Sequence, residues 1–422
     1  MIRQVNFKEV NGQIKMPSSK SLLHRYLMLS SRSKTMIKSG DLSIDAKMTL
    51  KGLKKLGSQI DYHKGTIFMQ GYNPVKEASI DLHESGASFR FLLPYAMTEE
   101  RGVLFEGSQR LSQRPMSDLI RSMQEHGIIF SNDKLPFRAI GQLKGGLFRL
   151  RGDVSSQYIS GLLMAAPFMK KDLTIELTSP LVSKQYVDMT LAVMKEMEIE
   201  VNQSKLGYQI KPQKPSLPKE ITVEGDWSNA MTFIAMALIK GEISLTGLFK
   251  NSYQGDAKII NFLKKHGANI KWVDNKLIVK KSKLEGMKLD IEKHIDLFPV
   301  LSVLALNAKG PSTFTNIKRL AYKESNRIES TLALHQALGS QPKLDENSFT
   351  VYPSRLKGGV IDSYNDHRLV MAANLANMLS DQPVTILQSH AIDKSFPNFW
   401  KLLDSIGGKN DCLQRTDINH KN

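Results

Sequence analysis

The chain has 422 residues, of which 41% are hydrophobic, and its formal net charge is +17 at pH 7. This length predicts two or three domains, and the composition supplies enough apolar residues for a sizeable core. The single cysteine, Cys412, excludes an internal disulfide and a cysteine-rich zinc site, and the apolar runs are shorter than the ~18 residues that a membrane span needs. We therefore expect a soluble, cytoplasmic protein with no membrane partner.

The positive charge is spread along the chain. No dense block of lysine and arginine is present, and the aromatic residues, 7% of the total, are not interleaved with the cations. A nucleic-acid binder is one alternative, but a dispersed positive field equally attracts small anionic substrates. We favour the small anions and expect no nucleic-acid partner.

Apolar segments of strand length alternate with helical stretches, which is typical of an α/β protein. We expect strands at residues 66–69, 173–177, 243–245 and 277–279. We expect helices at residues 21–31, 87–97, 115–126, 157–169, 186–197, 228–239, 257–267, 297–308, 324–337, 367–379 and 397–406. Residues 211–219, with three prolines, indicate a connection, and the polar tail after about residue 407 is expected to fray.

A weak internal repeat is visible. The tetrapeptides GDVS at 152–155 and GDWS at 225–228 each precede an apolar helix, and they lie 73 residues apart. Six units of about 70 residues would nearly fill the chain, so a repeat architecture is worth testing.

Several polar turns run directly into these apolar helices. Lys20 lies in the first turn of the helix that follows Ser18 and Ser19, where a cation opposes the helix dipole. An external anion would remove the conflict, because free N–H groups, Lys20 and Ser21 could all point at it. Arg25 shares a helix face with Ser21. An ordinary capped helix with an unfavourable lysine is the alternative.

Three further turns in the first half of the chain have the same character. Gly86 would let a ligand approach the backbone closely. Arg114 precedes Pro115, which suits the first turn of a helix. Residues 155–157 (Ser155, Ser156 and Gln157) begin an apolar run and could equally be plain helix caps.

The second half of the chain carries candidate acid and base groups. Asp296 precedes a nearly all-apolar helix, so it is an N-cap candidate or a general base. Lys323 and Arg327 are four residues apart and would share a face of a helix, with Glu324 three residues before Arg327. Arg368 lies at the start of another apolar helix.

Taken together, these turns supply seven cations: Lys20, Arg25, Arg114, Lys323, Arg327, Arg368 and, before the final helix, Lys394. The chain has neither a metal-ligand motif nor a nucleotide-binding fingerprint. Each turn alone is explained by a cap or a surface ion pair. Their number favours an enzyme or binder for small multi-anionic molecules, without a metal or a redox cofactor.

The ordered motifs carry a resemblance to a known family. They are PSSKS at 17–21 with Arg25, SG at 85–86 with Arg90, QRP at 113–115, GDVSSQ at 152–157, SKQYVD at 183–188, VEGD at 223–226, QGD at 254–256, Asp296, KE at 323–324 with Arg327, NDHR at 365–368 and KSFP at 394–397. From about residue 11 to 406 the chain resembles the 3-phosphoshikimate 1-carboxyvinyltransferases, also called 5-enolpyruvylshikimate-3-phosphate synthases.

The resemblance implies a fold of two similar domains, each built from three βαβαββ units in an inside-out α/β barrel. It implies one domain at residues 18–224 and a second that joins residues 1–17 to 225–422, with the active site in the cleft between them. It also implies that the protein is a monomer without a cofactor.

The implied reaction moves the enolpyruvyl group of phosphoenolpyruvate to the 5-hydroxyl of shikimate 3-phosphate and releases phosphate. The implied catalytic residues are Asp296 as proton acceptor, Glu324 as proton donor, Lys20 and Lys394. The implied shikimate 3-phosphate ligands are Lys20, Ser21, Arg25, Ser155, Ser156, Gln157, Ser183, Asp296 and Lys323. The implied phosphoenolpyruvate ligands are Lys20, Gly86, Arg114, Gln157, Arg327, Arg368 and Lys394. No metal ligand is implied.

The chain departs from the family pattern at a few positions. Ser18 and Ile295 replace a usual glycine and a common proline. Glu84 stands where many members have asparagine beside the phosphoenolpyruvate site, and Arg319 stands where some have a substrate-binding asparagine. In the family, glyphosate competes with phosphoenolpyruvate, and members with glycine at the position of Gly86 are typically sensitive to it.

Two alternatives stay open. The sister enzyme transfers enolpyruvyl to UDP-N-acetylglucosamine, but it usually relies on a cysteine in a mobile loop, whereas Cys412 lies in the tail. A non-catalytic anion-binding protein with this fold is the other, and the presence of both Asp296 and Glu324 argues against it.

Overall fold

The computed structural model describes residues 1–413 of the chain. Contacts divide it into two compact units, Ser18–Val223 and a unit that joins Met1–Pro17 to the chain from Glu224 onward. We call them the inserted unit and the terminal unit. None of the helices between residues 1 and 413 is both long and apolar enough to cross a membrane.

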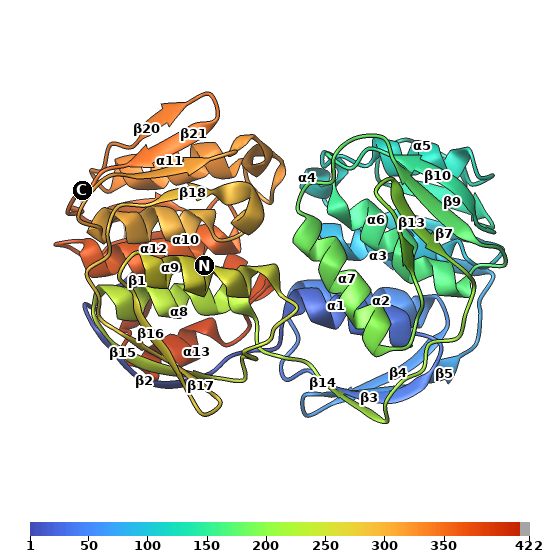
Figure 1. Ribbon diagram of the computed structural model, residues 1–422, viewed down its shortest axis with the longest axis horizontal. Helices are drawn as coiled ribbons and strands as arrows, with labels where there is room; N and C mark the ends of the chain where they lie inside the picture. The colour runs from blue at the N-terminus through green and yellow to red at the C-terminus, as the bar shows by residue number, and fades with distance from the viewer. Residues whose placement is uncertain (414–422) are drawn as a thin grey trace. The chain divides into compact units, whose positions relative to one another are not determined.

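The inserted unit contains three four-stranded sheets (Figure 1). In spatial order they are β14 (Glu220–Thr222), β3 (Lys34–Lys38), β5 (Thr66–Tyr72) and β4 (Ser58–His63); β6 (Glu77–Asp81), β7 (Arg101–Glu106), β9 (Phe137–Gly141) and β8 (Ile129–Phe130); and β10 (Gly146–Leu150), β11 (Leu173–Leu177), β13 (Gly207–Ile210) and β12 (Asn202–Gln203).

The terminal unit also contains three four-stranded sheets. They are β16 (Asn269–Val273), β17 (Lys276–Lys280), β15 (Gly241–Thr246) and β2 (Val10–Lys15); β18 (Lys288–Asp290), β19 (Ser312–Thr315), β21 (Ser348–Val351) and β20 (Lys343–Asp345); and β22 (Gly359–Asp362), β23 (Val384–Leu387), β1 (Ile2–Val5) and β24 (Asn410–Leu413).

All six sheets repeat one pairing pattern. Each has one parallel pair, such as β6 with β7, and the remaining neighbours are antiparallel, such as β7 with β9 and β9 with β8. The parallel pairs need a crossover, which a helix supplies. The pattern confirms the α/β class. It occurs six times, which is the internal repeat that the two GDxS tetrapeptides indicated.

In the inserted unit, three helices form the core: α1 (Lys20–Ser30), α3 (Gly86–Ala96) and α6 (Ser156–Ala165). They contact one another and are buried along almost their whole length. Helices that are apolar on all sides belong inside a protein. The other helices of this unit are α2 (Ile44–Lys55), α4 (Gln109–Ser112), α5 (Ser117–Gln124), α7 (Lys184–Glu196) and the 3-10 segment η1 (Ala166–Phe168).

The terminal unit repeats this arrangement with α8 (Trp227–Ile239), α10 (Phe298–Leu304) and α12 (His367–Leu379) as its mutually contacting central helices. In Figure 1 the central helices of each unit lie between its sheets, so the helices are inside and the sheets outside. The remaining helices are α9 (Ile259–Lys265), α11 (Arg327–Ala337) and α13 (Phe399–Asp404), and the 3-10 segments are η2 (Gly255–Lys258), η3 (Ile291–His294), η4 (Ala305–Asn307), η5 (Lys318–Tyr322) and η6 (Ser389–Lys394).

Several predicted boundaries of helices and of the tail are wrong. The tail does not fray directly after residue 407, because β24 pairs antiparallel with β1 and so completes the sixth sheet. Cys412 lies in this strand; residues 414–422 of the predicted tail fall outside the described part. Pro115 is not in a helix but lies between α4 and α5. The four expected strands are confirmed within β5, β11, β15 and β17.

A close approach between α3 and α6 generates the first prediction. A Cβ atom built on Gly161 would lie 2.3 Å from the carbonyl oxygen of Arg90, which is backbone and cannot rotate away. Gly161→Ala should therefore lower the free energy of unfolding by about 1–3 kcal/mol, despite the ~1 kcal/mol that alanine gains over glycine in a helix. Urea unfolding measures the change.

Gly310→Ala is the matched control, because a Cβ atom there would meet nothing within 4 Å. If both variants unfold at the wild-type urea concentration, α3 and α6 do not pack as closely as described.

Candidate active site

Lys20 opens the core helix α1 of the inserted unit. Ser19 caps this helix, since its Oγ accepts a hydrogen bond from the Leu22 amide at 3.4 Å. The Lys20 Nζ lies 2.7 Å from Asp45 Oδ2 on α2, and both side chains are about 15% exposed (16% and 15%). The position of Lys20 is as predicted, and Asp45 offsets the conflict with the helix dipole that we expected an external anion to relieve.

Arg25 lies buried between α1 and α7. It is 2% exposed. Its Nη1 donates to the Ser21 carbonyl at 2.7 Å, its Nη2 to the Tyr186 carbonyl at 2.8 Å and its Nε to Thr190 Oγ1 at 2.8 Å. Burial lowers the pKa of its guanidinium to about 10. Arg25 therefore joins α1 to α7 and holds the backbone of Ser21.

Gly86 lies against two arginines at the start of α3. A Cβ atom built on it would be 2.5 Å from Arg114 Nη1 and 3.0 Å from Arg90 Nη1. Arg90 Nη1 in turn donates to Gln157 Oε1 at 2.7 Å. Gly86 thus lies beside Arg114, and Arg90 links this turn to Gln157. The Arg114 Nε is buried and has no hydrogen-bond partner among residues 1–413.

The serine-rich turns have more modest roles of their own. Ser155 caps α6 by accepting a hydrogen bond from the Gln157 amide at 3.3 Å, and Ser156 is buried in the first turn. Ser183 precedes α7 in a left-handed backbone conformation (φ +49°) and is 6% exposed. These positions are compatible with the predicted roles and do not test them.

A buried hydroxyl network ties the starts of the inserted unit's helices together. His24 Nδ1 is 2.7 Å from Thr49 Oγ1, which is 2.7 Å from Ser88 Oγ. Ser88 Oγ reaches Ser85 Oγ at 2.7 Å and donates to the Asp45 carbonyl at 3.1 Å. Burial, followed by the charges of neighbouring Lys20 and Arg25, lowers the pKa of His24 to about 3, so the ring is neutral at pH 7.

In the terminal unit, three carboxylates surround one buried arginine. Arg327 is 1% exposed; its Nε donates to Asp366 Oδ2 at 2.8 Å, its Nη1 to Asp296 Oδ1 at 2.7 Å and its Nη2 to Glu324 Oε2 at 2.7 Å. Burial opposes the charged guanidinium, but Asp366, Glu324 and Asp296 outweigh it and raise its pKa well above the usual value. Lys323 Nζ also donates to Asp296 Oδ1, at 3.0 Å, and burial lowers the pKa of Lys323.

The contacts of Lys323 and Glu324 do not come from a shared helix face, as the spacing predicted. Lys323 ends η5 in an extended conformation and α11 begins only at Arg327, so Lys323 and Glu324 belong to the turn before the helix. Asp296 is not the N-cap of α10, because Leu297 occupies that position. The carboxylate points instead to Lys323 and Arg327, where it accepts two charge-assisted hydrogen bonds.

The start of α12 carries the last two predicted cations. Arg368 is 5% exposed and its Nη1 donates to Asn229 Oδ1 of α8 at 3.2 Å. Lys394 is 8% exposed and its Nζ donates to the Asn365 carbonyl at 2.6 Å, three residues before Arg368. Asp366, which is fully buried, caps the helix by accepting a hydrogen bond from the Arg368 amide at 2.9 Å.

Sequence reasoning missed Arg90, Asp366 and Asn229 as functional neighbours. Arg90 and Asp366 fall inside the quoted motifs, and for Arg90 the available signal was a charge within an otherwise apolar run. Arg319, whose role stayed open, lies 3.8 Å from Glu292 in a half-exposed ion pair.

Fold and side chains together define an α/β protein that gathers cations, hydroxyls and buried carboxylates at the starts of its central helices, as suits small molecules with several anionic groups. No group of three or more His, Cys, Asp and Glu side chains within residues 1–413 is arranged to hold a metal ion.

Comparison with known proteins gives the family. The model of EPSP synthase (3-phosphoshikimate 1-carboxyvinyltransferase) matches residues 5–403. A 3-phosphoshikimate 1-carboxyvinyltransferase of Clostridium novyi is 36% identical over 95% of this chain and 96% of its own, and one of Methanocorpusculum labreanum is 33% identical over 96% and 98%. The chain therefore belongs to the EPSP synthase family, as its motifs indicated, and the relatives favour this interpretation over the UDP-N-acetylglucosamine enzyme.

Solved structures share the fold. An EPSP synthase from Acinetobacter baumannii has a TM-score of 0.81 and 22% identity and covers 98% of this chain and 100% of its own. The enolpyruvyl transferase NikO from Streptomyces tendae has a TM-score of 0.77 and 15% identity, over 97% and 98% of the two chains. At these identities the likeness confirms the predicted inside-out α/β fold and carries no further argument.

The buried neutral His24 predicts a pH effect on stability. Between its ordinary pKa of 6.5 and its folded value of about 3, the unfolded chain binds a proton at His24 that the folded chain does not. The free energy of unfolding should therefore fall as the pH is lowered through this range. In His24→Gln, urea unfolding at pH 7 and pH 5 should show a smaller fall than in the wild type.

His63→Gln is the control, because His63 is exposed at the end of β4. An equal loss of stability between pH 7 and 5 in wild type and His24→Gln would show that His24 titrates normally in the folded protein.

Proposed function

We propose that this protein transfers the enolpyruvyl group of phosphoenolpyruvate to the 5-hydroxyl of shikimate 3-phosphate, a step in the synthesis of chorismate and the aromatic amino acids. The observation that carries the proposal, beside the family, is the network around Arg327. It joins two largely buried carboxylates, Asp296 and Glu324, to one fixed cation. A reaction that removes one proton and delivers another needs two such groups.

The proposed binding residues come from both units. For shikimate 3-phosphate they are Lys20, Ser21, Arg25, Ser155, Ser156, Gln157, Ser183, Asp296 and Lys323. For phosphoenolpyruvate they are Lys20, Gly86, Arg114, Gln157, Arg327, Arg368 and Lys394. Each substrate carries a phosphate and a carboxylate, so the four anionic groups match a set rich in lysine and arginine.

In the proposed chemistry Asp296 accepts the proton of the 5-hydroxyl. The oxygen of that hydroxyl forms a bond to C2 of phosphoenolpyruvate. Glu324 gives a proton to C3, which becomes a methyl group in a tetrahedral intermediate. The intermediate then returns one C3 proton to the Glu324 carboxylate and expels phosphate, and the double bond between C2 and C3 forms again. We assign Lys20 and Lys394 to the charge on the reacting phosphoenolpyruvate, and the sequence of steps uses no metal or redox cofactor.

We further propose that the protein is a cytoplasmic monomer whose partners are these two small molecules. The absence of a membrane-spanning helix among residues 1–413 is compatible with this and does not decide it.

The proposed function is tested by phosphate release from phosphoenolpyruvate with two acceptors. Shikimate 3-phosphate should support release and UDP-N-acetylglucosamine should not. Release with the nucleotide sugar alone would assign the chain to the sister reaction, and release with neither acceptor would favour an anion-binding protein without catalysis.

Glu324→Gln separates proton donation from binding. Glutamine keeps an oxygen that can accept the hydrogen bond from Arg327 Nη2, but it cannot deliver the proton. Turnover should fall by roughly 10²–10⁴-fold, while calorimetry shows shikimate 3-phosphate still binding. Glu329→Gln, an exposed position on α11, is the control and should retain wild-type turnover. Near wild-type turnover in Glu324→Gln would remove Glu324 from the proton-donor role.

Gly86→Ala tests the phosphoenolpyruvate assignment. The added methyl would overlap the Arg114 and Arg90 guanidinium groups, so Arg114 must shift. We expect glyphosate to inhibit the wild type competitively with phosphoenolpyruvate. The substitution should weaken glyphosate more than the substrate, because the inhibitor is longer and a close-packed wall absorbs an extra methyl poorly.

Inhibition constants for the two proteins decide the matter, with Gly310→Ala as the control. Equal constants in wild type and Gly86→Ala would take Gly86 out of the pocket wall. A wild type that glyphosate does not inhibit would instead point to the negative charge of Glu84.

A further inference from the structure

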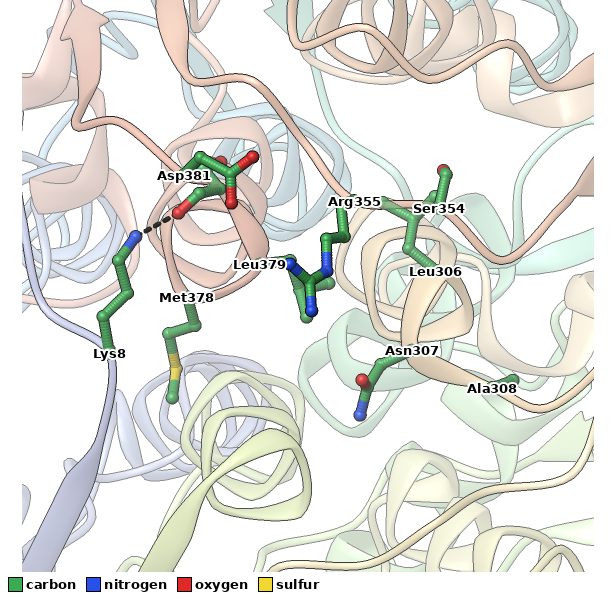
Figure 2. Close-up of a pocket in the computed structure, with 10 residues that line it drawn as sticks. Lys8, Leu306, Asn307, Ala308, Ser354, Arg355, Met378, Leu379 and Asp381 are labelled. Atoms are coloured by element: carbon green, nitrogen blue, oxygen red, sulfur yellow. Dashed lines mark hydrogen bonds between the residues drawn. The ribbon is translucent and has the colours of Figure 1, made fainter.

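A pocket lies in the terminal unit at the C-terminal end of α12, the opposite end from Asp366 and Arg368. It has a volume of about 570 Å³. Figure 2 shows charged side chains and apolar ones bordering the same space. None of its lining residues belongs to the set proposed for catalysis or substrate binding.

Lys8 lines one side of this pocket, and its ammonium group already binds the end of α12. Its Nζ donates to the carbonyls of Asn377 (2.7 Å) and Ser380. Helix α12 has no basic residue in its own last turn, so Lys8 supplies the positive charge that a helix C-terminus favours. Asn377 Nδ2 donates to the Phe7 carbonyl at 2.7 Å and holds the Lys8 backbone beside the helix.

Arg355 lies on the same side of the pocket as the end of α12, and its side chain is not used by the fold. Its neighbour Leu356 forms a parallel bridge with Ser380, with its amide 3.1 Å from the Leu379 carbonyl, and the Asp381 amide donates to the Leu356 carbonyl at 2.8 Å. The backbone thus fixes both Arg355 and Asp381 next to the end of α12. Yet within residues 1–413 the Arg355 guanidinium forms no hydrogen bond or ion pair, and Arg355 and Asp381 do not pair with each other.

The rest of the lining includes one side-chain amide and several aliphatic side chains. The side-chain amide of Asn307 makes no hydrogen bond within the described chain and borders the pocket with Arg355 (Figure 2). Leu306, Met378 and Leu379 supply the apolar wall, and no aromatic ring lines the pocket. A volume near 570 Å³ falls within the range of pockets that hold small molecules.

We propose that this pocket binds an amino acid with an aliphatic side chain in its zwitterionic form. The Arg355 guanidinium offers a two-pronged donor to the carboxylate, and the Asn307 amide adds a further donor. Asp381 offers an acceptor to the ammonium group. Leu306, Met378 and Leu379 cover the aliphatic side chain. Arg355 and Asp381 offer one charge of each sign, which matches a zwitterion. The charge of Asp381 also opposes the burial that lowers the pKa of Lys8, and it would repel a phosphate dianion.

The proposal is independent of the proposed enzymatic function, and calorimetry on the full-length chain tests it. The probes are L-leucine, 4-methylpentanoate, which lacks the ammonium group, 3-methylbutylamine, which lacks the carboxylate, and inorganic phosphate. Leucine should bind saturably, and each of the other three should bind at least about tenfold more weakly, a loss of ~1.4 kcal/mol. No saturable binding of leucine, or phosphate binding as tight as leucine, would overturn the proposal.

Two variants locate the site. Arg355→Gln should weaken leucine at least tenfold, and Asp381→Asn should weaken leucine but not 4-methylpentanoate. Lys357→Gln is the matched control, since Lys357 is exposed two residues further along and does not line the pocket. All three positions are exposed, and unchanged urea midpoints will show that each variant is folded. Leucine binding that survives Arg355→Gln would place the amino acid elsewhere and refute the site.

Discussion

The contact between Arg327 and Asp366 fixes the chemistry-bearing part of the terminal unit. Both side chains are buried, and two guanidinium nitrogens reach the two carboxylate oxygens at 2.8 and 3.2 Å. Asp366 also caps α12, so the pair joins the first residue of α11 to the start of a central helix. With Arg327 fixed in this way, its remaining hydrogen bonds determine where Asp296 and Glu324 can lie. Removing one member of such a pair leaves an uncompensated buried charge, which costs far more than a surface pair.

The central helices give both units the same electrostatic character. Their apolar sides bury them along their length, so their starts must carry the polar residues. Lys20 opens α1, Gly86 opens α3 and Gln157 lies in the first turn of α6, while Arg368 lies in the first turn of α12. Helix starts already carry a partial positive charge, and cations placed there are favourable only if anions are close. Asp45 and Asp366 provide some of that compensation, and the proposed phosphate and carboxylate groups of the substrates would provide the rest.

The sequence predicted the elements that depend on local pattern. It did not predict the contacts between residues that are distant along the chain. Apolar runs located the central helices, and the cations Lys20 and Arg368 lie at the starts of two of them, α1 and α12. The turn at Lys323 and Glu324 was taken for helix, because spacing cannot distinguish a helical face from a turn that a buried partner holds. Asp366 pairs with a residue 39 positions away, Arg90 reaches Gln157 across 67 positions, and β24 finds β1 at the other end of the chain. Periodicity contains no signal for such contacts.

The variant Asp366→Asn tests the central claim most directly, because Asp366 is not assigned to either substrate. Asparagine keeps the shape and an oxygen that can cap α12, but it removes the charge that fixes Arg327. We predict that the free energy of unfolding falls by about 3–5 kcal/mol and that turnover falls with it, measured by urea unfolding and by phosphate release on the folded variant. Wild-type stability together with wild-type turnover would contradict the account, because Arg327 would then hold Asp296 and Glu324 without its buried partner.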